Sequence, residues 1–487
     1  MRIVKHPVKF FFRLENLKRK ERYHEKMISD DTPILPLGGK YPDLLLRHCY
    51  EGIIVFGATG SGKTSGSGAA LARGFLQAGL GGLVLCAKPD EAERWQHYAR
   101  LMNREKDIVL FSESKFNFLR YEQARSTSKG GGITENIVHV FYEAMQAFSR
   151  GQSKGGSNDP YWENAAKTLL RNTIDLILLA GEDLTLTRIC EVIYDTPGQA
   201  EDPEPEGEAP HPYEYRKLFD KALNRDLTKR QLEDLKITYR FFEKDFGKLS
   251  EKTKGSIISS FTSLADGLMR GLMADLLGTS TKLVPELSRQ GKIIILDLDI
   301  MTYGELGKAV SVIFKTIWQK AMERFPGNPV FLFADESHFF QTHYDALFQS
   351  TCRGFKVCTA YLSQNKPGYL LELRDEHRIA ALMGNLRNKF FHANDCPITN
   401  HMAAELIGKE WKQRTSAGGS KGSTIDQQSS NWSSQMQRDY RIQPEDFLSL
   451  KTGGADFNNE TEAIFFRSPN YVKLAFDQWP SLERKKR

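Results

Sequence analysis

The stretch from Ile53 to Thr64 reads IIVFGATGSGKT, and it constrains the fold of this chain more than any other feature. An apolar, β-branched run leads into the pattern G-x-x-x-x-G-K-[ST], and the residues that follow, SGSGAALARGFLQAG, have the pattern of a helix. Glycines let successive backbone N–H groups turn toward a phosphate, where a side chain would block the approach. Strand, glycine turn and helix in this order predict a cradle for a nucleoside triphosphate.

Each position of this turn has an expected task. Lys63 should reach the β- and γ-phosphates, and Thr64 should offer its hydroxyl to Mg²⁺ at the positive start of a helix. ATP and Mg²⁺ are therefore the expected cofactors. A glycine-rich surface turn is the alternative, but the flanking strand and helix supply the context that the motif requires. The predicted nucleotide-binding residues are Gly57, Ala58, Thr59, Gly60, Ser61, Gly62, Lys63, Thr64 and Ser65.

The second half of such a site should be an apolar strand that ends in an acid, and Val330 to Glu336 reads VFLFADE. We expect Asp335 to hold the water shell of Mg²⁺ and Glu336 to orient or deprotonate the attacking water. Phosphoryl transfer depends mainly on positioning and charge neutralisation, so two acids suffice. An ordinary buried strand that reaches solvent is the alternative. The run IIILDLD, from Ile293 to Asp299, lacks the Asp-Glu pair and is assigned to a neighbouring core strand.

Length and charge set only broad limits. The 487 residues can bury one large core or divide into two or three domains. A net charge of +6 permits a nucleic-acid partner without requiring one. The six cysteines are scattered and lack C-x-x-C spacing, which favours reduced, buried thiols and a cytoplasmic location. No run approaches the roughly 18 apolar residues of a membrane-spanning helix, so no transmembrane segment is expected.

Apolar strand-like runs alternate with helical patterns along most of the chain, which is typical of a parallel sheet covered on both faces. Between about Phe118 and Gly291 the strand signals vanish, and apolar residues recur at helical spacing. These patterns predict an α/β domain with a mostly parallel central sheet, interrupted by an all-α domain. The strand-like runs are 52–56, 82–87, 107–111, 292–298, 330–334, 357–362, 389–393 and 462–466.

The expected domain order follows from these patterns. The N-terminal arm is basic, and its short apolar run does not make a signal peptide. It is a solvated arm, a helix packed on its own domain, or an interfacial or partner-docking segment. Three polar stretches, at 149–157, 196–212 and 413–439, should be mobile or exposed connections, and the last is expected to be a long loop. The predicted parts are an arm at 1–45, a nucleotide-binding domain at 46–117 and 292–487, and the all-α domain at 118–291.

Two further polar residues flank the strand-like run VCTAYLSQN. Gln364 lies at its end, where a polar side chain can touch the γ-phosphate. Arg353 precedes it and could complete the site of a neighbouring subunit by stabilising the transferring phosphoryl group. The alternatives are a strand cap for Gln364 and a surface ion pair for Arg353.

The order of these segments resembles the type IV coupling proteins, the TraG/TraD-type conjugative DNA transfer ATPases of the FtsK/HerA group of ring motors. The resemblance spans nearly the whole chain beyond about residue 45. It is carried by VFGATGSGKT (55–64), LVLCAKPDE (83–91), NDPYWENAAKTLL (158–170), FLFADESHFF (331–340), RGFKVCTAYLSQN (353–365) and NKFFHANDCPITNHMAAELIG (388–408).

This resemblance implies a RecA-like P-loop NTPase domain that carries the all-α domain and assembles as a homohexamer. DNA, as a relaxase nucleoprotein, would pass through the central pore to a type IV secretion channel as ATP is hydrolysed at subunit interfaces. The catalytic residues implied are Lys63, Glu336, Gln364 and Arg353, the last donated to the adjacent subunit. The metal contacts implied are Thr64 and Asp335. The all-α domain would meet the relaxosome or protein substrates.

Two features depart from the family pattern. A basic arm replaces the N-terminal membrane helices of most members, which favours peripheral docking on a membrane partner protein at the inner face of the cell membrane. Many members have an acid two residues before the lysine of the second-strand turn, where this chain has Cys86-Ala87-Lys88, so the role of Lys88 is open. Two other functions remain as alternatives: a nuclease-partnered DNA-processing or defence ATPase, and a nucleotide-gated adaptor for protein recognition.

Overall fold

The computed structural model describes residues 28–38, 41–125, 134–152, 160–196, 213–278, 280–421 and 428–478. Most of the predicted arm, of the acidic connection 196–212 and of the stretch 149–157 therefore lies outside the described residues.

Strands and helices mostly alternate along the middle of the chain, which also has a long helical run between β5 and β6, and the last four strands follow one another without an α-helix among the described residues between them. The strands are β1 (Pro33–Leu35), β2 (Leu44–Leu45), β3 (Ile53–Phe56), β4 (Gly81–Leu85), β5 (Ile108–Leu110), β6 (Ile293–Leu296), β7 (Val330–Ala334), β8 (Val357–Ser363), β9 (Asn388–Phe391), β10 (Lys409–Lys421), β11 (Gln428–Tyr440), β12 (Glu460–Arg467) and β13 (Asn470–Asp477). The helices outside the helical run are α2 (Leu46–Cys49), α3 (Ala69–Gln77), α4 (Asp90–Leu101), α13 (Ile300–Arg324), α14 (His343–Thr351), α15 (Lys366–Leu373), α16 (Glu376–Asn385) and α17 (Pro397–Ile407). Those within it are α5 (Phe118–Ala124), α6 (Thr134–Gln152), α7 (Pro160–Leu179), α8 (Leu186–Tyr194), α9 (Glu214–Leu223), α10 (Lys229–Arg240), α11 (Glu251–Leu268) and α12 (Gly271–Leu277).

A nine-stranded sheet forms the centre of the molecule, in the order β13-β12-β9-β3-β8-β7-β4-β6-β5. The strands from β9 to β5 in this order are parallel, whereas β12 and β13 are antiparallel additions at one edge. Every strand-like run of the sequence is a strand of this sheet, and IIILDLD contains β6, which pairs with β4. The edge strand β13 was not predicted, because its side chains are mostly not buried and its apolar residues are interrupted by a lysine. The predicted α/β fold class is confirmed.

The parallel direction of the neighbouring strands determines where the turns that follow them lie. In a parallel sheet all carboxyl ends of the strands meet at one edge. Strand β8 lies between β3 and β7, and β4 follows β7 on the other side. The turns after these four strands therefore lie next to each other, although they come from distant parts of the sequence.

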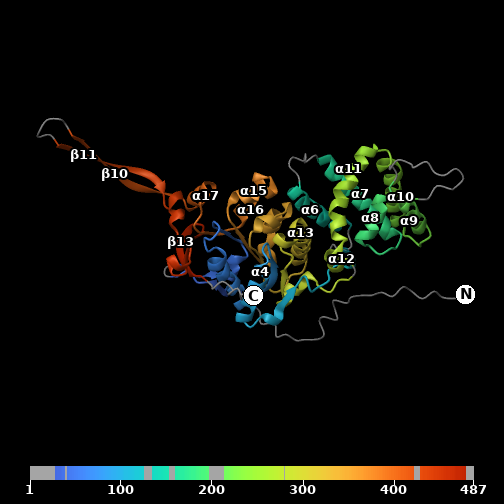
Figure 1. The fold of residues 1–487 in the computed structure, drawn as a ribbon, viewed down its shortest axis with the longest axis horizontal. Coiled ribbons are helices and arrows are strands. Elements are labelled where there is room, and N and C mark those ends of the chain that lie inside the picture. The colour runs from blue at the N-terminus through green and yellow to red at the C-terminus, as the bar shows by residue number, and fades with distance from the viewer. Residues whose placement is uncertain are drawn as a thin grey trace.

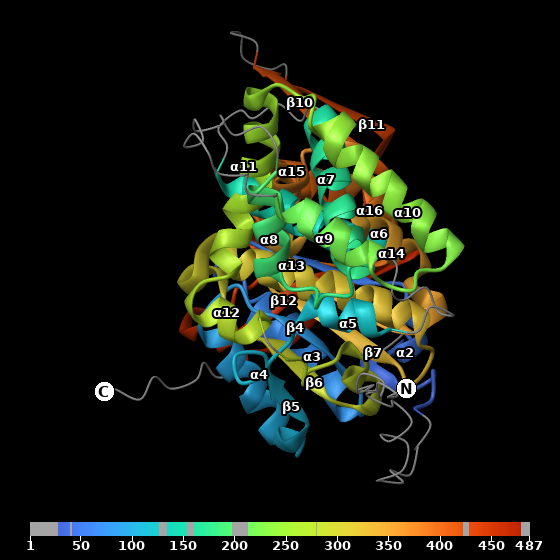
Figure 2. The same ribbon diagram turned by 90° about the vertical axis from the view of Figure 1, so that its right-hand side faces the viewer.

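The chain between β5 and β6 is helical in its described part, as the apolar spacing predicts. Its helices lie at one end of the molecule in Figure 1 and in front of the sheet in Figure 2. Helix α6 packs along α13, and an isolated bridge between Phe116 and Thr281 joins the outgoing and returning chain. The boundaries of the two domains remain a prediction.

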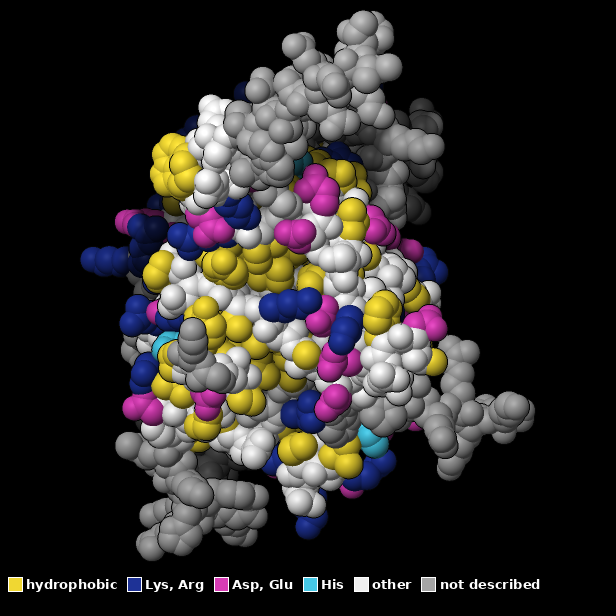
Figure 3. Space-filling view, turned by 90° about the vertical axis from the view of Figure 1, so that its left-hand side faces the viewer, with side chains coloured by type: hydrophobic (Ala, Val, Ile, Leu, Met, Phe, Trp, Pro, Cys, Tyr) yellow, Lys and Arg dark blue, Asp and Glu magenta, His cyan; other side chains and the backbone are white. Residues whose placement is uncertain are grey.

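The described residues of the polar stretch 413–439, which are 413–421 and 428–439, form strands, so the prediction of a long loop was wrong for them. Strands β10 and β11 pair antiparallel without interruption, from Lys409 opposite Tyr440 to Lys421 opposite Gln428, and form an arm that projects from the body (Figure 1). The two strands pair through backbone groups. Their sequence is rich in Ser, Gly and Gln and lacks the apolar alternation by which a strand is predicted, so the sequence did not indicate a hairpin. Figure 3 views the end of the molecule that carries this hairpin, where hydrophobic side chains gather between charged ones.

Part of the predicted N-terminal arm belongs to the body of the protein. Strands β1 and β2 pair with each other, and β1 packs against α3. Ile34 and Leu44 are both buried. No helix in the described part of the chain has the length and apolar character needed to cross a membrane.

A buried ion pair joins α13 to α14. The ammonium of Lys315 contacts the carboxylate of Asp345, and both side chains are almost fully buried. Gln319 Nε2 and Tyr361 Oη also donate to Asp345, at 2.8 Å and 3.0 Å. Burial alone would raise the pKa of Asp345, but Lys315 outweighs it and holds that pKa below its usual value. The carboxylate is therefore charged in the folded protein.

We expect Asp345→Asn to destabilise the protein by about 3–5 kcal/mol, because it leaves the Lys315 ammonium buried without a counter-ion. Urea unfolding measures the loss. The double variant Lys315→Met/Asp345→Leu removes both charges and should recover much of it. The matched control is Asp266→Asn, which breaks a solvent-exposed pair with Arg270 and should change stability little. A loss at Asp345 no larger than that of the control would contradict the expectation.

Candidate nucleotide-binding site

The glycine turn that follows β3 forms one wall of the candidate site. Gly62 has a φ of 81°, a left-handed conformation that residues with side chains rarely adopt. A Cβ atom on Gly62 would also lie 2.2 Å from the Cγ2 of Thr461 on β12. A Cβ on Gly57 would lie 2.3 Å from Ser61 Oγ. The compact turn therefore requires glycine at both positions.

The turn continues into the π-helical segment Thr64–Gly68 and then into α3. Such a helix start directs backbone N–H groups toward an anion. Beneath it, Ser67 Oγ lies 2.7 Å from His392 Nε2, and His392 is fully buried. Burial, and then the charge of Lys63, lower the pKa of His392 to about 3, so the ring is neutral. Sequence reasoning missed this support, since a single histidine after a strand carries no signal.

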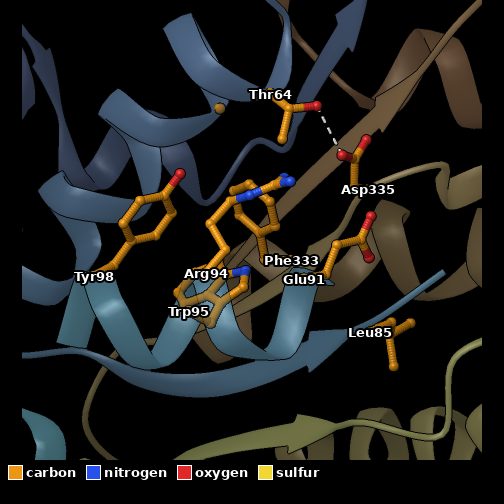
Figure 4. A pocket seen from close by; sticks show the side chains of 9 residues that line it. Thr64, Leu85, Glu91, Arg94, Trp95, Tyr98, Phe333 and Asp335 are labelled. Carbon is orange, nitrogen blue, oxygen red and sulfur yellow. Dashed lines mark hydrogen bonds between the residues drawn. The ribbon is translucent and has the colours of Figure 1, made fainter. Parts of the chain in front are cut away.

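The two predicted metal contacts lie side by side. Thr64 Oγ1 donates a hydrogen bond of 2.8 Å to Asp335 Oδ2, although the residues are 271 positions apart in sequence (Figure 4). A hydroxyl and a carboxylate oxygen are ligand types that Mg²⁺ prefers, with water and phosphate completing its shell. The described residues contain no group of three or more His, Cys, Asp or Glu arranged to hold a metal alone. The pair thus fits a magnesium ion that arrives with a nucleotide.

Glu336 lies directly beyond Asp335 and is held by several partners. Its backbone has a φ of 45°, and its side chain is 4% exposed. The Oε1 atom is 3.5 Å from Lys63 Nζ and 3.1 Å from Lys88 Nζ. Burial alone would raise the pKa of Glu336, but these two lysines outweigh it and lower that pKa below its usual value. The carboxylate is therefore ionised in the folded protein.

Gln364 follows β8, between the glycine turn and the acid pair. Its Nε2 lies 3.5 Å from Glu336 Oε1. The structure therefore brings Gln364, Lys63 and Glu336 to one place, as expected from the strand order. Their roles in catalysis remain predictions.

Arg353 does not join this group within one chain. It lies in the short helical turn Cys352–Phe355, which precedes β8 and so lies at the amino ends of the parallel strands. Its side chain is 72% exposed, and its Nη1 is 3.7 Å from Glu51 Oε1. Glu51 also contacts Arg387 and Arg467, at 3.8 Å and 2.9 Å. The guanidinium of Arg353 thus faces solvent at the edge opposite the glycine turn.

A small cavity beside Thr64 and Asp335 contains an acid that sequence reasoning missed. Glu91 is 3% exposed, and its Oε2 accepts a hydrogen bond of 2.7 Å from the backbone N–H of Ala87. Its Oε1 has no hydrogen-bond partner among the described residues. In Figure 4 the carboxylates of Glu91 and Asp335 lie on the same side of the cavity. The lining residues are Thr64, Gly68, Leu85, Glu91, Arg94, Trp95, Tyr98, Phe333 and Asp335.

Comparison with known proteins identifies the fold. No protein-family model and no curated protein matched the sequence. Among solved structures, the unbound bacterial conjugative coupling protein TrwB superposes with a TM-score of 0.56 at 12% identity, over 92% of this chain and 91% of that chain. TrwB with ADP and Mg²⁺ gives 0.56 at 13% identity, over 92% of each chain. VirB4 of Thermoanaerobacter pseudethanolicus gives 0.50 at 13% identity, over 93% of this chain and 98% of that chain.

Identities this low establish the fold and nothing finer. The chain has the RecA-like P-loop fold of these proteins, so the expected fold and the resemblance to a coupling protein in fold are confirmed.

Glu91 should make the stability of the nucleotide-free protein depend on pH. Burial, and then the charge of Asp335, raise the pKa of Glu91 from 4.5 to about 8. The folded state therefore keeps a proton that the unfolded chain loses, and stability should fall as the pH rises from about 4.5 to about 8. Glu91→Gln cannot ionise, so its stability relative to wild type should increase by about 2–4 kcal/mol over this range.

Thermal or urea unfolding in the presence of a chelator, at several pH values, measures this difference. The control is Glu93→Gln, which changes an exposed acid of the same helix. Wild-type and Glu91→Gln stabilities that run parallel with pH would contradict the expectation.

Proposed function

We propose that this protein is an ATP-hydrolysing DNA translocase that brings DNA or a nucleoprotein substrate to a type IV secretion channel. The observation that carries the proposal is the hydrogen bond between Thr64 and Asp335, which joins the phosphate cradle and the acid pair around one small space. The ionised Glu336 beside it supports hydrolysis rather than binding alone. The solved structures of similar fold include coupling protein TrwB bound to ADP and Mg²⁺, which supports the same cofactors here.

The chemistry of the site follows from these positions. Lys63 and the N–H groups of the glycine turn bind the β- and γ-phosphates and stabilise the charge that develops in transfer. Thr64 and Asp335 hold Mg²⁺, which when bound neutralises phosphate charge. Glu336 accepts the proton of the water that attacks the γ-phosphorus, as the bond to the leaving ADP oxygen breaks. Gln364 contacts Glu336 and lies where it can sense the γ-phosphate.

The exposed position of Arg353 supports a ring assembly. Its guanidinium lies at the edge of the sheet opposite its own glycine turn, so it cannot reach a nucleotide bound in the same chain. It could reach one bound by a neighbour, since the side chain is 72% exposed and its ion pair, from Nη1 to Glu51 Oε1, is 3.7 Å long. We infer a homohexamer in which each site is completed across an interface, with DNA in the central pore and the helical segment toward the substrate protein. The location that we infer is cytoplasmic, with peripheral attachment through a membrane partner.

Two substitutions at the site should separate binding from hydrolysis. Lys63→Ala should lose nucleotide affinity, because the ammonium that binds the phosphates is gone. Glu336→Gln should bind ATP normally and hydrolyse it about 100- to 10,000-fold more slowly, because the general base is gone. Fluorescent-nucleotide titration and phosphate release measure the two effects. Glu113→Gln, at an exposed acid, is the control, and normal turnover by Glu336→Gln would overturn the assignment.

The same assay tests the partner. Single- or double-stranded DNA should stimulate phosphate release by wild type if the protein is a translocase. Rates that do not respond to either DNA would favour the nucleotide-gated adaptor instead.

Mixing two inactive variants tests the trans role of Arg353. An interface formed by an Arg353→Ala subunit, which keeps Glu336, and a Glu336→Gln neighbour, which donates Arg353, is complete. Mixed assemblies should therefore recover part of the DNA-stimulated ATPase rate that each variant alone lacks. Arg378→Ala, at another exposed arginine, should behave as wild type. Mixed rings without any recovery would show that Arg353 does not act across the interface.

A further inference from the structure

Lys88 lies at the candidate site although no function has been assigned to it above. Its Nζ is 3.1 Å from Glu336 Oε1, and Lys63 Nζ is 3.5 Å from the same oxygen. One carboxylate oxygen therefore contacts two ammonium groups. The other oxygen, Oε2, has no hydrogen-bond partner in the described part of the chain, and His338 Nδ1 lies 3.9 Å from it.

The sheet explains why these residues meet. Strands β4 and β7 are parallel neighbours, with Leu85 opposite Ala334. Lys88 follows Leu85 by three residues, and Glu336 follows Ala334 by two. Both residues therefore lie in the turns just beyond the carboxyl ends of these paired strands. The side chain of Lys88 is 32% exposed and that of Glu336 is 4% exposed. Lys88 thus reaches the buried carboxylate from the solvent side.

The backbone conformation of Glu336 indicates that its side chain must be held in place by its contacts. Its left-handed φ of 45° is uncommon for a residue with a side chain. Such conformations persist where the surroundings fix them, and they are frequent at functional sites. The described contacts of the Glu336 carboxylate include those with Lys63, Lys88 and Gln364. The orientation of the Glu336 carboxylate therefore depends on these partners.

A bound triphosphate changes this set of partners. Under the proposed function the Lys63 ammonium moves its contact to the β- and γ-phosphates, and Glu336 loses one of its two cations. The turn that carries Lys88 is anchored independently, because Oε2 of the Glu91 carboxyl group accepts a hydrogen bond from the N–H of Ala87, and α4 begins at Asp90. Lys88 can therefore remain on Glu336 when Lys63 leaves.

We propose that Lys88 is a positioning residue for hydrolysis: its ammonium binds Oε1 of Glu336 and leaves Oε2 to accept a hydrogen bond from the attacking water. This inference rests on the proposed function. It also answers the question raised by the sequence, where the lysine of the second-strand turn lacks the acid that usually precedes it. Here the acid that partners Lys88 is Glu336, in the turn that follows β7.

Kinetics of Lys88 variants test the proposal with MgATP as the probe. Lys88→Met should lower kcat by about 10- to 100-fold, as expected for a misplaced catalytic group, and leave KM for ATP within about threefold. Lys88→Arg keeps a cation near Glu336 and should recover most of the lost kcat. The control is Lys106→Met, at an exposed lysine that follows α4, which should behave as wild type.

Other results would overturn the proposal in distinct ways. An unchanged kcat in Lys88→Met means that Glu336 does not need Lys88. A raised KM or a lost nucleotide affinity with normal kcat, as expected for a phosphate ligand, means that Lys88 binds the nucleotide. A loss that Lys88→Arg does not reverse, together with a lowered melting temperature, means that Lys88 is only structural.

A double variant separates this inference from the proposed function. If Lys88 acts through Glu336, adding Lys88→Met to Glu336→Gln should lower the residual single-turnover rate by less than about twofold. A further drop as large as that of Lys88→Met alone would show that the two residues act independently. A wild-type protein that hydrolyses no ATP would overturn the proposed function and this role together, whereas normal Lys88→Met in an active protein overturns this role alone.

Discussion

The shared carboxyl edge of the parallel strands is the constraint on which the site depends. Because β3, β8, β7 and β4 run in one direction and lie side by side, the residues that follow them meet. The bond between Thr64 and Asp335 is the most direct sign of this convergence. The antiparallel strand β12 also borders the site, because Thr461 lies so close to Gly62 that a side chain at that position would collide with it. Neither half of the site could take this form without the pairing order of the sheet.

Buried charge organises the region around this edge. Glu336 and Asp345 are both buried, and each is kept ionised by lysines that outweigh the effect of burial on its pKa. Glu91 forms no ion pair with a lysine or arginine among the described residues, so burial and the charge of Asp335 raise its pKa instead. Three acids within one α/β layer thus differ in charge because their neighbours differ. The arrangement keeps the carboxylates of Glu336 and Asp345 ionised at neutral pH although both are buried.

Sequence reasoning found the parts of the fold that local chemistry encodes. The glycine turn and the acid pair are contiguous motifs, and the parallel strands are continuous apolar runs because both of their faces are buried. The hairpin β10–β11 escaped prediction, since its pairing depends on backbone groups rather than apolar side chains. Sequence reasoning assigned no role in the site to Lys88, Glu91 or His392 for another reason. Each contacts or influences residues that follow a different strand, and the spacing of residues within one segment does not reveal such a contact. The exposed edge position of Arg353 was likewise visible only in the fold.

The narrow connection at Phe116 and Thr281 has a consequence for how such a protein can diversify. Outgoing and returning chain touch there, at the rim of the sheet farthest from β12 and β13. A recombination event that joins at these two points exchanges the entire helical cassette while every strand keeps its neighbours. An incoming cassette must still fit α13, against which α6, α5 and α11 now pack.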